Sequence, residues 1–413
     1  MRISTSQYFN MNVATMDDQQ ATLSQLYQEI SSQNALSTPA DNPLGAAQAV
    51  QLSATATSLS QYTTNQNSAL SSLQSEDSTL SSVITTLQSA NTAGLSVGSG
   101  ILNDTNRTAI ASQLSSLRDQ LLTYANATDS SGNALFAGFQ NTTQAFTTDA
   151  SGNVIYSGDA GTRTVQVTGS NQVATGDNGA SVFQSVSATN AEPVSAGNAL
   201  NTGTGVISTV TVTDPTNTAN ADSYEIQFAG TGASQTYSVI DNSTVPPTTL
   251  TPTPSPSYTE GSDIQIAGQT VSITGTPGDG DSFTVQPGNA SSDVFANLNA
   301  MIAALQQPVT GDAAAQATLQ NAMTTGLTQL SNTLNNVTAV QASVGGREQE
   351  VKALQTVTQT NALQTQSNLA DVTQVDLVST ISKYTLEQSA LQASQQAFVQ
   401  IQNMSLFQYI GSN

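Results

Sequence analysis

The sequence lacks three residue types that carry much of enzyme chemistry: it has no cysteine, no histidine and no tryptophan. Without cysteine and histidine, the chain cannot form a disulfide, a Ser-His-Asp triad, a thiolate nucleophile or an imidazole metal site. The commonest general acid–base residue is missing as well. We therefore expect no enzymatic activity, no cofactor and no metal.

Charged residues are scarce, and most of them are acidic. Only 8% of the 413 residues are charged, and 7 Lys+Arg stand against 28 Asp+Glu, which gives a formal net charge of −21. Nucleic acids and anionic membranes are bound by clustered Lys and Arg, so neither is an expected partner. No run approaches the roughly 18 apolar residues of a membrane span. The first residues lack the apolar core of a cleavable signal, so any export is expected to be independent of such a signal.

Three local patterns resemble chemical sites, and each has a simpler explanation. The paired acids are Asp222 and Glu225, Asp17 and Asp18, and Glu76 and Asp77. They are treated as solvated acids, because nothing in the sequence places any pair in a cleft. Residues 278–282, GDGDS, lack the spaced ligands of a calcium loop and predict a tight turn before a strand. Ser382 and Lys383 are adjacent on a helix, where neighbouring side chains point apart. We expect no catalytic residues.

Proline and glycine are concentrated in the middle of the chain. All prolines except Pro39 and Pro43 lie within residues 193–308. Because proline and glycine interrupt helices and mark turns, their distribution predicts an α+β fold. Long N- and C-terminal helices would pack together as a coiled-coil bundle, with an antiparallel β-rich region inserted between them. The expected domains are an N-terminal helical part (1–146), a β-rich part (147–290, divisible into 147–185 and 190–290) and a C-terminal helical part (291–413).

The N-terminal helices are predicted from heptad spacing. Apolar residues between Phe9 and Ile30 follow a 4-3-4-3 pattern, which is the seam of a coiled coil. Residues 44–90 form a second, long helix in which leucines recur every seven positions. Asp41 or Asn42 would cap this helix, and Pro43 suits its first turn. A third helix is expected over residues 106–125.

The C-terminal part shows the same periodicity. A short helix is expected at 295–305 and a longer one at 319–337. From Arg347 the chain is again without Gly or Pro until Gly411, and its last helical seam runs from Leu377 to Gln402. The last seam contains repeated glutamines, which favour ordering by partners. The terminal seams supply the candidate subunit or partner interface: Phe9, Val13, Met16, Leu23, Tyr27, Ile30, Leu377, Ile381, Tyr384, Leu391, Phe398 and Ile401.

The central region changes to a period of two, which is typical of strands. Residues 154–156 and 162–167 flank a Ser-Gly-Asp-Ala-Gly stretch and predict a β-hairpin. Further short strands are expected up to residue 285, among them one over 206–213. Residues 94–100, which contain three glycines, are expected to form a flexible link between two helices.

Several stretches resemble the flagellin superfamily, and within it the hook-associated proteins. Residues 30–47, ISSQNALSTPADNPLGAA, resemble the N-terminal "sPaDdPlgAa" motif, and the opening MRIST is also typical. Residues 135–146, LFAGFQNTTQAF, resemble "YlFsG…tqPF", with Leu135 in place of the usual Tyr and Ala145 in place of Pro. VGGR (344–347), ADVTQVD (370–376) and SLFQYI (405–410) resemble C-terminal motifs. The resemblance covers about residues 1–180 and 290–413.

This resemblance implies a structural protein of the extracellular bacterial flagellum. It implies secretion through the flagellar type III apparatus and assembly as a ring of subunits at the hook–filament junction. There the ring would join hook-associated protein 1 to the flagellin filament. It also implies a cytoplasmic export chaperone bound to the C-terminal helix.

Two alternatives stay open from the sequence. The chain could be flagellin itself, although the MRIST start and Pro43 differ from the usual flagellin pattern, in which "DDAAG" occurs. From another class, the β-rich region could belong to an extracellular hydrolase or adhesin, which glycan binding by residues 190–290 alone would indicate.

Overall fold

The computed structural model describes residues 5–36, 38–40, 42–98, 102–129, 132–140, 144–189, 191–290 and 292–410, without the side chains of 5, 6 and 401–410. Two compact units account for the chain. The terminal unit comprises Met1–Thr64 and Leu354–Asn413, and the central unit comprises Asn65–Ala353. The domain boundaries predicted near residues 147 and 290 follow the change from helix to strand and stay a prediction.

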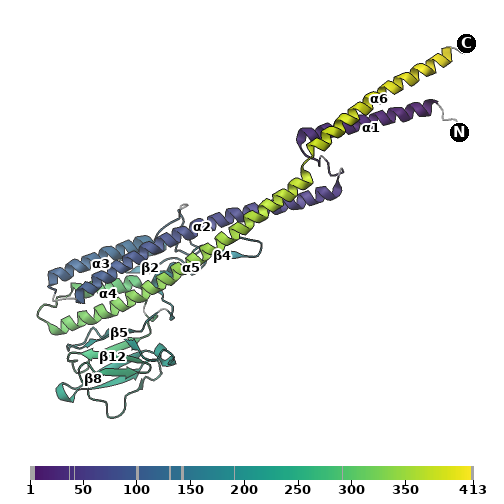
Figure 1. Cartoon of the computed structure of the whole chain (residues 1–413). Helices are drawn as coiled ribbons and strands as arrows, with labels where there is room; N and C mark the ends of the chain where they lie inside the picture. The colour runs from purple at the N-terminus through teal and green to yellow at the C-terminus, as the bar shows by residue number, and fades with distance from the viewer. Residues whose placement is uncertain are drawn as a thin grey trace. The chain divides into compact units, whose positions relative to one another are not determined.

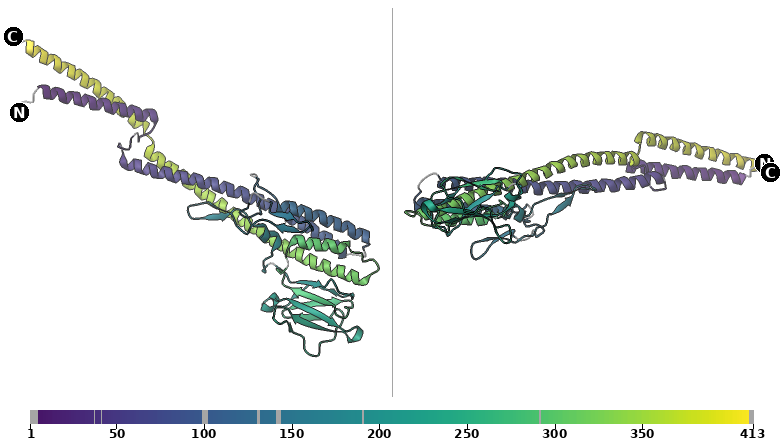
Figure 2. Two further views of the ribbon diagram at one scale, coloured as in Figure 1. Left: turned by 180° about the vertical axis from the view of Figure 1, so that it is seen from behind. Right: turned by 90° about the horizontal axis from the view of Figure 1, so that it is seen from below.

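In the terminal unit, α1 (Thr5–Ser32) and α6 (Leu377–Ile410) lie side by side and run in opposite directions (Figures 1 and 2). The unit also contains the first part of α2 (Pro43–Gly98) and the last part of α5 (Ala313–Thr373). The prediction that the N- and C-terminal helices pack together is confirmed.

Both helical paths of the terminal unit are interrupted, and the two interruptions are bonded to each other. The N–H of Ala35 donates to the carbonyl of Thr373 at 2.8 Å, and the N–H of Val375 donates to that of Gln33 at 3.4 Å. Asp376 caps α6 by accepting from the N–H groups of residues 378 and 379 at 3.1 and 3.2 Å. Backbone pairing and this cap therefore end α5 and start α6 within a stretch that contains neither Gly nor Pro, and α6 begins at Leu377, where the predicted last seam begins.

The start of α2 follows the sequence expectation. Asn42 stands at the N-cap, and its Oδ1 accepts from the N–H of Gly45 at 2.9 Å. Pro43 occupies the first helical position, where its missing N–H costs nothing. Asp41, the alternative cap, lies outside the described residues. At the other end, α2 continues through Gly94 to Gly98, so the predicted flexible link over 94–100 is helical as far as residue 98.

The central unit is built on four helices: the rest of α2, the rest of α5, α3 (Asp104–Ala125) and α4 (Val294–Gln306). The helix predicted at 319–337 is part of α5, which passes through Gly345 and Gly346 without a break. Heptad positions fill the core between these helices. The fully buried members of the two long seams are Leu73, Leu80, Leu87, Leu330, Val337, Val344 and Val351.

The β-rich part lies between Phe146 and Gln286. A five-stranded sheet has the order β10-β9-β8-β13-β5, and a second sheet has the order β11-β12-β6, with β7 also paired to β12. The two sheets enclose a shared apolar core that includes Ile226, Ile273 and Phe283. The strands are β5 (Val194–Gly197), β6 (Val206–Ile207), β7 (Thr211–Val212), β8 (Tyr224–Ala229), β9 (Thr236–Asp241), β10 (Thr248–Thr249), β11 (Asp263–Ile266), β12 (Gln269–Thr274) and β13 (Ser282–Gln286).

Two hairpins precede these sheets: β1 (Phe146–Thr148) with β2 (Val154–Tyr156), and β3 (Thr164–Gln166) with β4 (Gln172–Ala174). The predicted hairpin between 154–156 and 162–167 is therefore wrong, because each segment pairs with a strand on its other side. Phe146 packs at the base of the first hairpin, with its ring 5.5 Å from those of Phe183 and Phe295. The strand predicted over 206–213 is divided into β6 and β7, which pair with opposite ends of β12.

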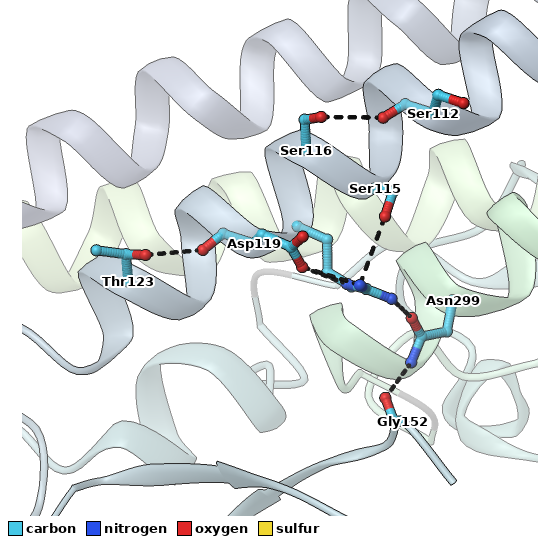
Figure 3. A network of polar contacts seen from close by, with 8 residues as sticks. Ser112, Ser115, Ser116, Asp119, Thr123, Gly152 and Asn299 are labelled. Carbon is cyan, nitrogen blue, oxygen red and sulfur yellow. Dashed lines mark hydrogen bonds and ion pairs between the residues drawn. The ribbon is translucent and has the colours of Figure 1, made fainter.

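A polar network connects the first hairpin with α3 and α4 (Figure 3). Arg118 on α3 donates to Oδ1 of Asn299 on α4 at 2.6 Å and pairs with Asp119 at 2.8 Å. Asn299 in turn donates to the carbonyl of Gly152 at 3.4 Å, in the turn between β1 and β2. One side-chain amide thus ties the hairpin turn to two helices.

Candidate subunit interface

The antiparallel pair of α1 and α6 brings the predicted seam residues of both chain ends together. The rings of Phe9 and Phe398 lie 5.1 Å apart. Further along the pair, Leu23 and Tyr27 of α1 line one groove with Tyr384 and Leu391 of α6. Glutamines and a serine complete the groove: Gln20, Ser24, Gln388, Gln392 and Gln395. The predicted seams are therefore in contact within one chain.

Even so, the predicted residues remain partly open to solvent. Val13, Met16, Leu23, Ile30, Tyr384, Leu391 and Phe398 are half-buried. Phe9, Tyr27, Leu377 and Ile381 are exposed, and Tyr27 retains 63% of its accessible surface. Ile401 lies on α6, but its side chain is outside the described residues, as are the opening Met1–Ser4 and the side chains of 405–410. Whether these positions contact another subunit stays a prediction.

The terminal unit contains no fully buried apolar side chain among its described residues. In the described part of the chain, every such side chain lies between Ala69 and Val351, within the central unit. The fully covered side chains of the terminal unit include three threonines, Thr358, Thr365 and Thr380. A helical assembly without a dry core receives little hydrophobic stabilisation of its own.

The seam of α5 shows this change directly. Its buried heptad positions are aliphatic from Leu330 to Val351 and become threonine at Thr358 and Thr365. The seam of α2 changes in the same sense, because Leu73 and Leu80 are fully buried whereas Leu52 and Leu59 are half-buried. The two long helices are thus packed tightly in the central unit and loosely in the terminal unit.

A second set of apolar side chains, not predicted from the sequence, lies outside the seams and faces solvent. Val378 is 79% exposed and Leu386 is 70% exposed on α6. The others in the terminal unit are Tyr8, Met11, Leu44, Val50, Val357, Leu363 and Val399. The available signal was an apolar residue outside the heptad positions of an otherwise polar helix. Large exposed apolar residues gathered on one unit are characteristic of interaction surfaces.

Charge plays a small part in this surface. Lys383 is the only basic residue of 5–64 and 354–413. Contacts made by these helices must therefore depend on apolar groups, amides and hydroxyls. The cationic side chains of the central unit have structural tasks; Arg107, for example, is buried and donates to the carbonyl of Leu102 at 2.8 Å.

The patterns that resembled chemical sites form none in the described residues. Ser382 donates its hydroxyl to the carbonyl of Val378 at 2.8 Å, so it is not paired with Lys383. Asp281 closes the predicted turn by accepting from the N–H groups of Thr202, Gly203 and Gly278. The described residues contain no cluster of three acidic residues that could hold a metal ion. None of the described helices is apolar over a stretch sufficient to span a membrane.

Comparison with protein families gives matches to two flagellar models. Residues 3–141 match the bacterial flagellin N-terminal helical region. Residues 196–287 match the D2-like domain of flagellar hook-associated protein 1, which corresponds to the β-rich region between β5 and β13.

Two relatives that match the chain along its whole length are both flagellar hook-associated protein 3. The chain is 28% identical over 408 residues to flagellar hook-associated protein 3 of Salmonella typhimurium and 27% identical over 411 residues to that of Escherichia coli, in each case covering 99% of both chains. The crystal structure of hook-associated protein 3 from Legionella pneumophila aligns with a TM-score of 0.70 at 26% identity, over 78% of this chain and 98% of that one. FlgL of Xanthomonas campestris aligns with a TM-score of 0.66 at 26% identity, over 76% and 97%.

Fold, exposed helical ends and relatives define the class: the chain is a structural flagellar protein with a flagellin-type helical region, and it is not an enzyme. Within that class it resembles flagellar hook-associated protein 3, the protein of the hook–filament junction, along its whole length. It is accordingly a component of the extracellular flagellum. The flagellin alternative has no better support.

Proposed function

We propose that the chain is the adaptor that joins hook-associated protein 1 to the flagellin filament. The observation that supports this most strongly is the terminal unit, whose described helices contain no fully buried apolar side chain and expose many large ones. Such helices gain stability when neighbouring subunits cover them.

The terminal helices are proposed to form these contacts between subunits arranged as a ring. Their seam residues engage one another within the chain, as Phe9 and Phe398 do, and leave the off-seam residues of α6 free for a neighbour. Contacts with hook-associated protein 1 and flagellin would use the same chemistry, because Lys383 is the only basic residue within 5–64 and 354–413.

Substitution of the exposed residues of α6 tests the proposal. V378D and L386D introduce a charge where a neighbour would pack and remove no buried contact, since both side chains are largely exposed. We expect strains that carry either variant to build hooks, release flagellin into the medium and lose motility, as a deletion strain would. V378L and L386M keep an apolar side chain at the same two positions and are expected to leave motility intact.

Filament retention decides the outcome. If the deletion strain keeps full-length filaments, the adaptor function is excluded. If V378D and L386D strains are fully motile, the exposed face of α6 is not the contact. Addition of purified chain to filament seeds separates the flagellin alternative, because flagellin extends the seeds and a junction protein does not.

Before export, the C-terminal helix is proposed to be held by a cytoplasmic chaperone and the chain to leave through the flagellar type III apparatus. The exposed apolar side chains of α6 are the features that a chaperone would cover. Removal of residues 377–413 is expected to abolish co-purification with the chaperone. Retained binding would place the chaperone site elsewhere in the chain.

A further inference from the structure

A buried carboxyl group lies at the meeting point of three elements in the central unit. Glu76 on α2 is 1% exposed, and its Oε1 accepts the N–H of Asp177 at 2.9 Å. Asp177 follows β4, and its carboxylate pairs with the guanidinium of Arg347 on α5. Arg347 also donates to the carbonyl of Ala174 at 3.3 Å. The segment of residues 174–177 is therefore held between α2 and α5 by these side chains.

The charges at this point do not balance if both acids are ionised. Two carboxyl groups share one guanidinium, and the buried Oε2 of Glu76 faces no donor among the described residues. Leaving a charged oxygen buried without a donor is costly. A proton on Glu76 removes the excess charge and converts Oε2 from an unsatisfied acceptor into a hydroxyl that can donate.

The electrostatic surroundings of Glu76 favour the same state. Burial, followed by the negative charge of Asp177, raises the pKa of Glu76 to about 8, against weaker lowering effects of the Asp177 N–H and of Arg347. The guanidinium of Arg163 lies against the carbonyls of Ala134 and Leu135 and is not among the charges that act on the pKa of Glu76. The charged groups that act on Glu76 are thus Asp177 after β4 and Arg347 on α5.

We propose that Glu76 carries a proton in the folded chain, and that this proton fastens the 174–177 segment to α2 and α5. The proton is bound more tightly in the folded chain than in the unfolded chain, where the carboxyl group of Glu76 has its ordinary pKa of about 4.5. Its stabilising effect is therefore complete below that value and is lost as pH rises through about 8. The central unit is a proton-dependent assembly that loosens in mildly alkaline solution.

A direct test follows the carboxyl carbons by NMR. The full chain contains eight glutamates, so ¹³C labelling of their carboxyl carbons gives a small set of signals. We expect one signal to titrate with a midpoint near pH 8 and to be absent in E76Q. If all glutamate signals titrate in the ordinary range near pH 4.5, the proposal is overturned.

A second variant tests the proton on Glu76 even if E76Q does not fold. D177N keeps the N–H that reaches Glu76 but removes the neighbouring negative charge, and it leaves Arg347 free to face Glu76. The midpoint of the unusual signal should move to lower pH in D177N. An unchanged or higher midpoint would show that the charge of Asp177 does not help to keep the proton on Glu76.

Thermal unfolding measures how much the proton on Glu76 stabilises the chain. The Tm of the full chain should fall between pH 6 and pH 9, whereas that of E76Q should stay constant because glutamine imitates the protonated acid. E350Q changes an exposed glutamate of α5 and should follow the unmodified chain. A Tm of E76Q that falls in parallel with that of E350Q would refute the role of this proton.

Discussion

The side-chain amide of Asn332 on α5 bonds to both backbone groups of Glu192. Its Nδ2 donates to the carbonyl at 2.8 Å, and its Oδ1 accepts the N–H at 2.9 Å. The amide thus replaces a strand partner for the segment that leads into β5. Asn321 on α5 makes a similar pair of bonds to two residues near β6. Its Oδ1 accepts the N–H of Ile207 at 2.9 Å, and its Nδ2 donates to the carbonyl of Gly205 at 3.0 Å.

Replacement of Asn332 by alanine should therefore destabilise the central unit. N332A leaves two backbone groups of Glu192 without partners and should lower the free energy of unfolding by about 1–3 kcal/mol. N335A changes an exposed asparagine one turn along α5 and should stay within about 0.5 kcal/mol of the unmodified chain. Denaturant unfolding at constant pH measures both, and equal values for the two variants would contradict the bridging role.

The difference in packing between the two units can be measured at two positions of one seam. Leu80 is fully buried and Leu59 is half-buried, and both belong to the heptad series of α2. L80A should cost about 2–5 kcal/mol, as large-to-small changes in a close-packed core do. L59A should cost less than half as much. Comparable losses in the two variants would show that the terminal unit has a core after all.

The contact between Phe9 and Phe398 predicts how the two chain ends depend on each other. F398A should remove an aromatic pair worth about 0.5–1.5 kcal/mol beyond its buried area. Hydrogen exchange of α1 should then accelerate, because α1 loses a partner on α6. V399A alters the adjacent exposed residue and should leave exchange in α1 unchanged; faster exchange in both variants would contradict a specific pair.

The network around Asn299 predicts a local effect. N299A removes the acceptor of Arg118 and the donor to the carbonyl of Gly152, so the turn between β1 and β2 should exchange its amide hydrogens faster while the β8–β9 pair is unaffected. A net cost of about 0.5–1.5 kcal/mol is expected for a hydrogen bond of this kind. Unchanged exchange at the turn would exclude the network as its anchor.

Local signals in the sequence predicted where most of the helices lie and gave Asn42 as one of two candidate caps of α2. Asn42 and Pro43 act within a single turn of helix, and heptad spacing is repeated over many turns, so both leave a strong local pattern. The pairing of the strands could not be predicted in this way. β2 pairs with β1 and not with β3, and β13 lies between β5 and β8. Such pairings depend on contacts between residues far apart in the chain.

The contact between the two chain ends was predicted in part, because it also depends on a repeated local pattern. The seam residues Phe9 and Phe398 were identified from periodicity, and the structure places them in contact. Val378 and Leu386 were missed because exposure depends on which face a partner helix covers, and spacing alone does not give that. The prediction that Glu76 is a solvated acid is wrong, because its side chain is buried. Glu76, Asp177 and Arg347 are about 100 and 170 positions apart in the chain, so no local pattern reveals that they meet.

The replacement of aliphatic residues by Thr358 and Thr365 along the seam of α5 has a calorimetric consequence. The heat-capacity change of unfolding arises mainly from newly hydrated apolar surface, and the described part of the terminal unit has little of it to expose. Its melting should therefore remove much of the helical circular dichroism while adding little to the heat-capacity step. The central unit, which holds the leucine and valine seams, should supply nearly all of that step.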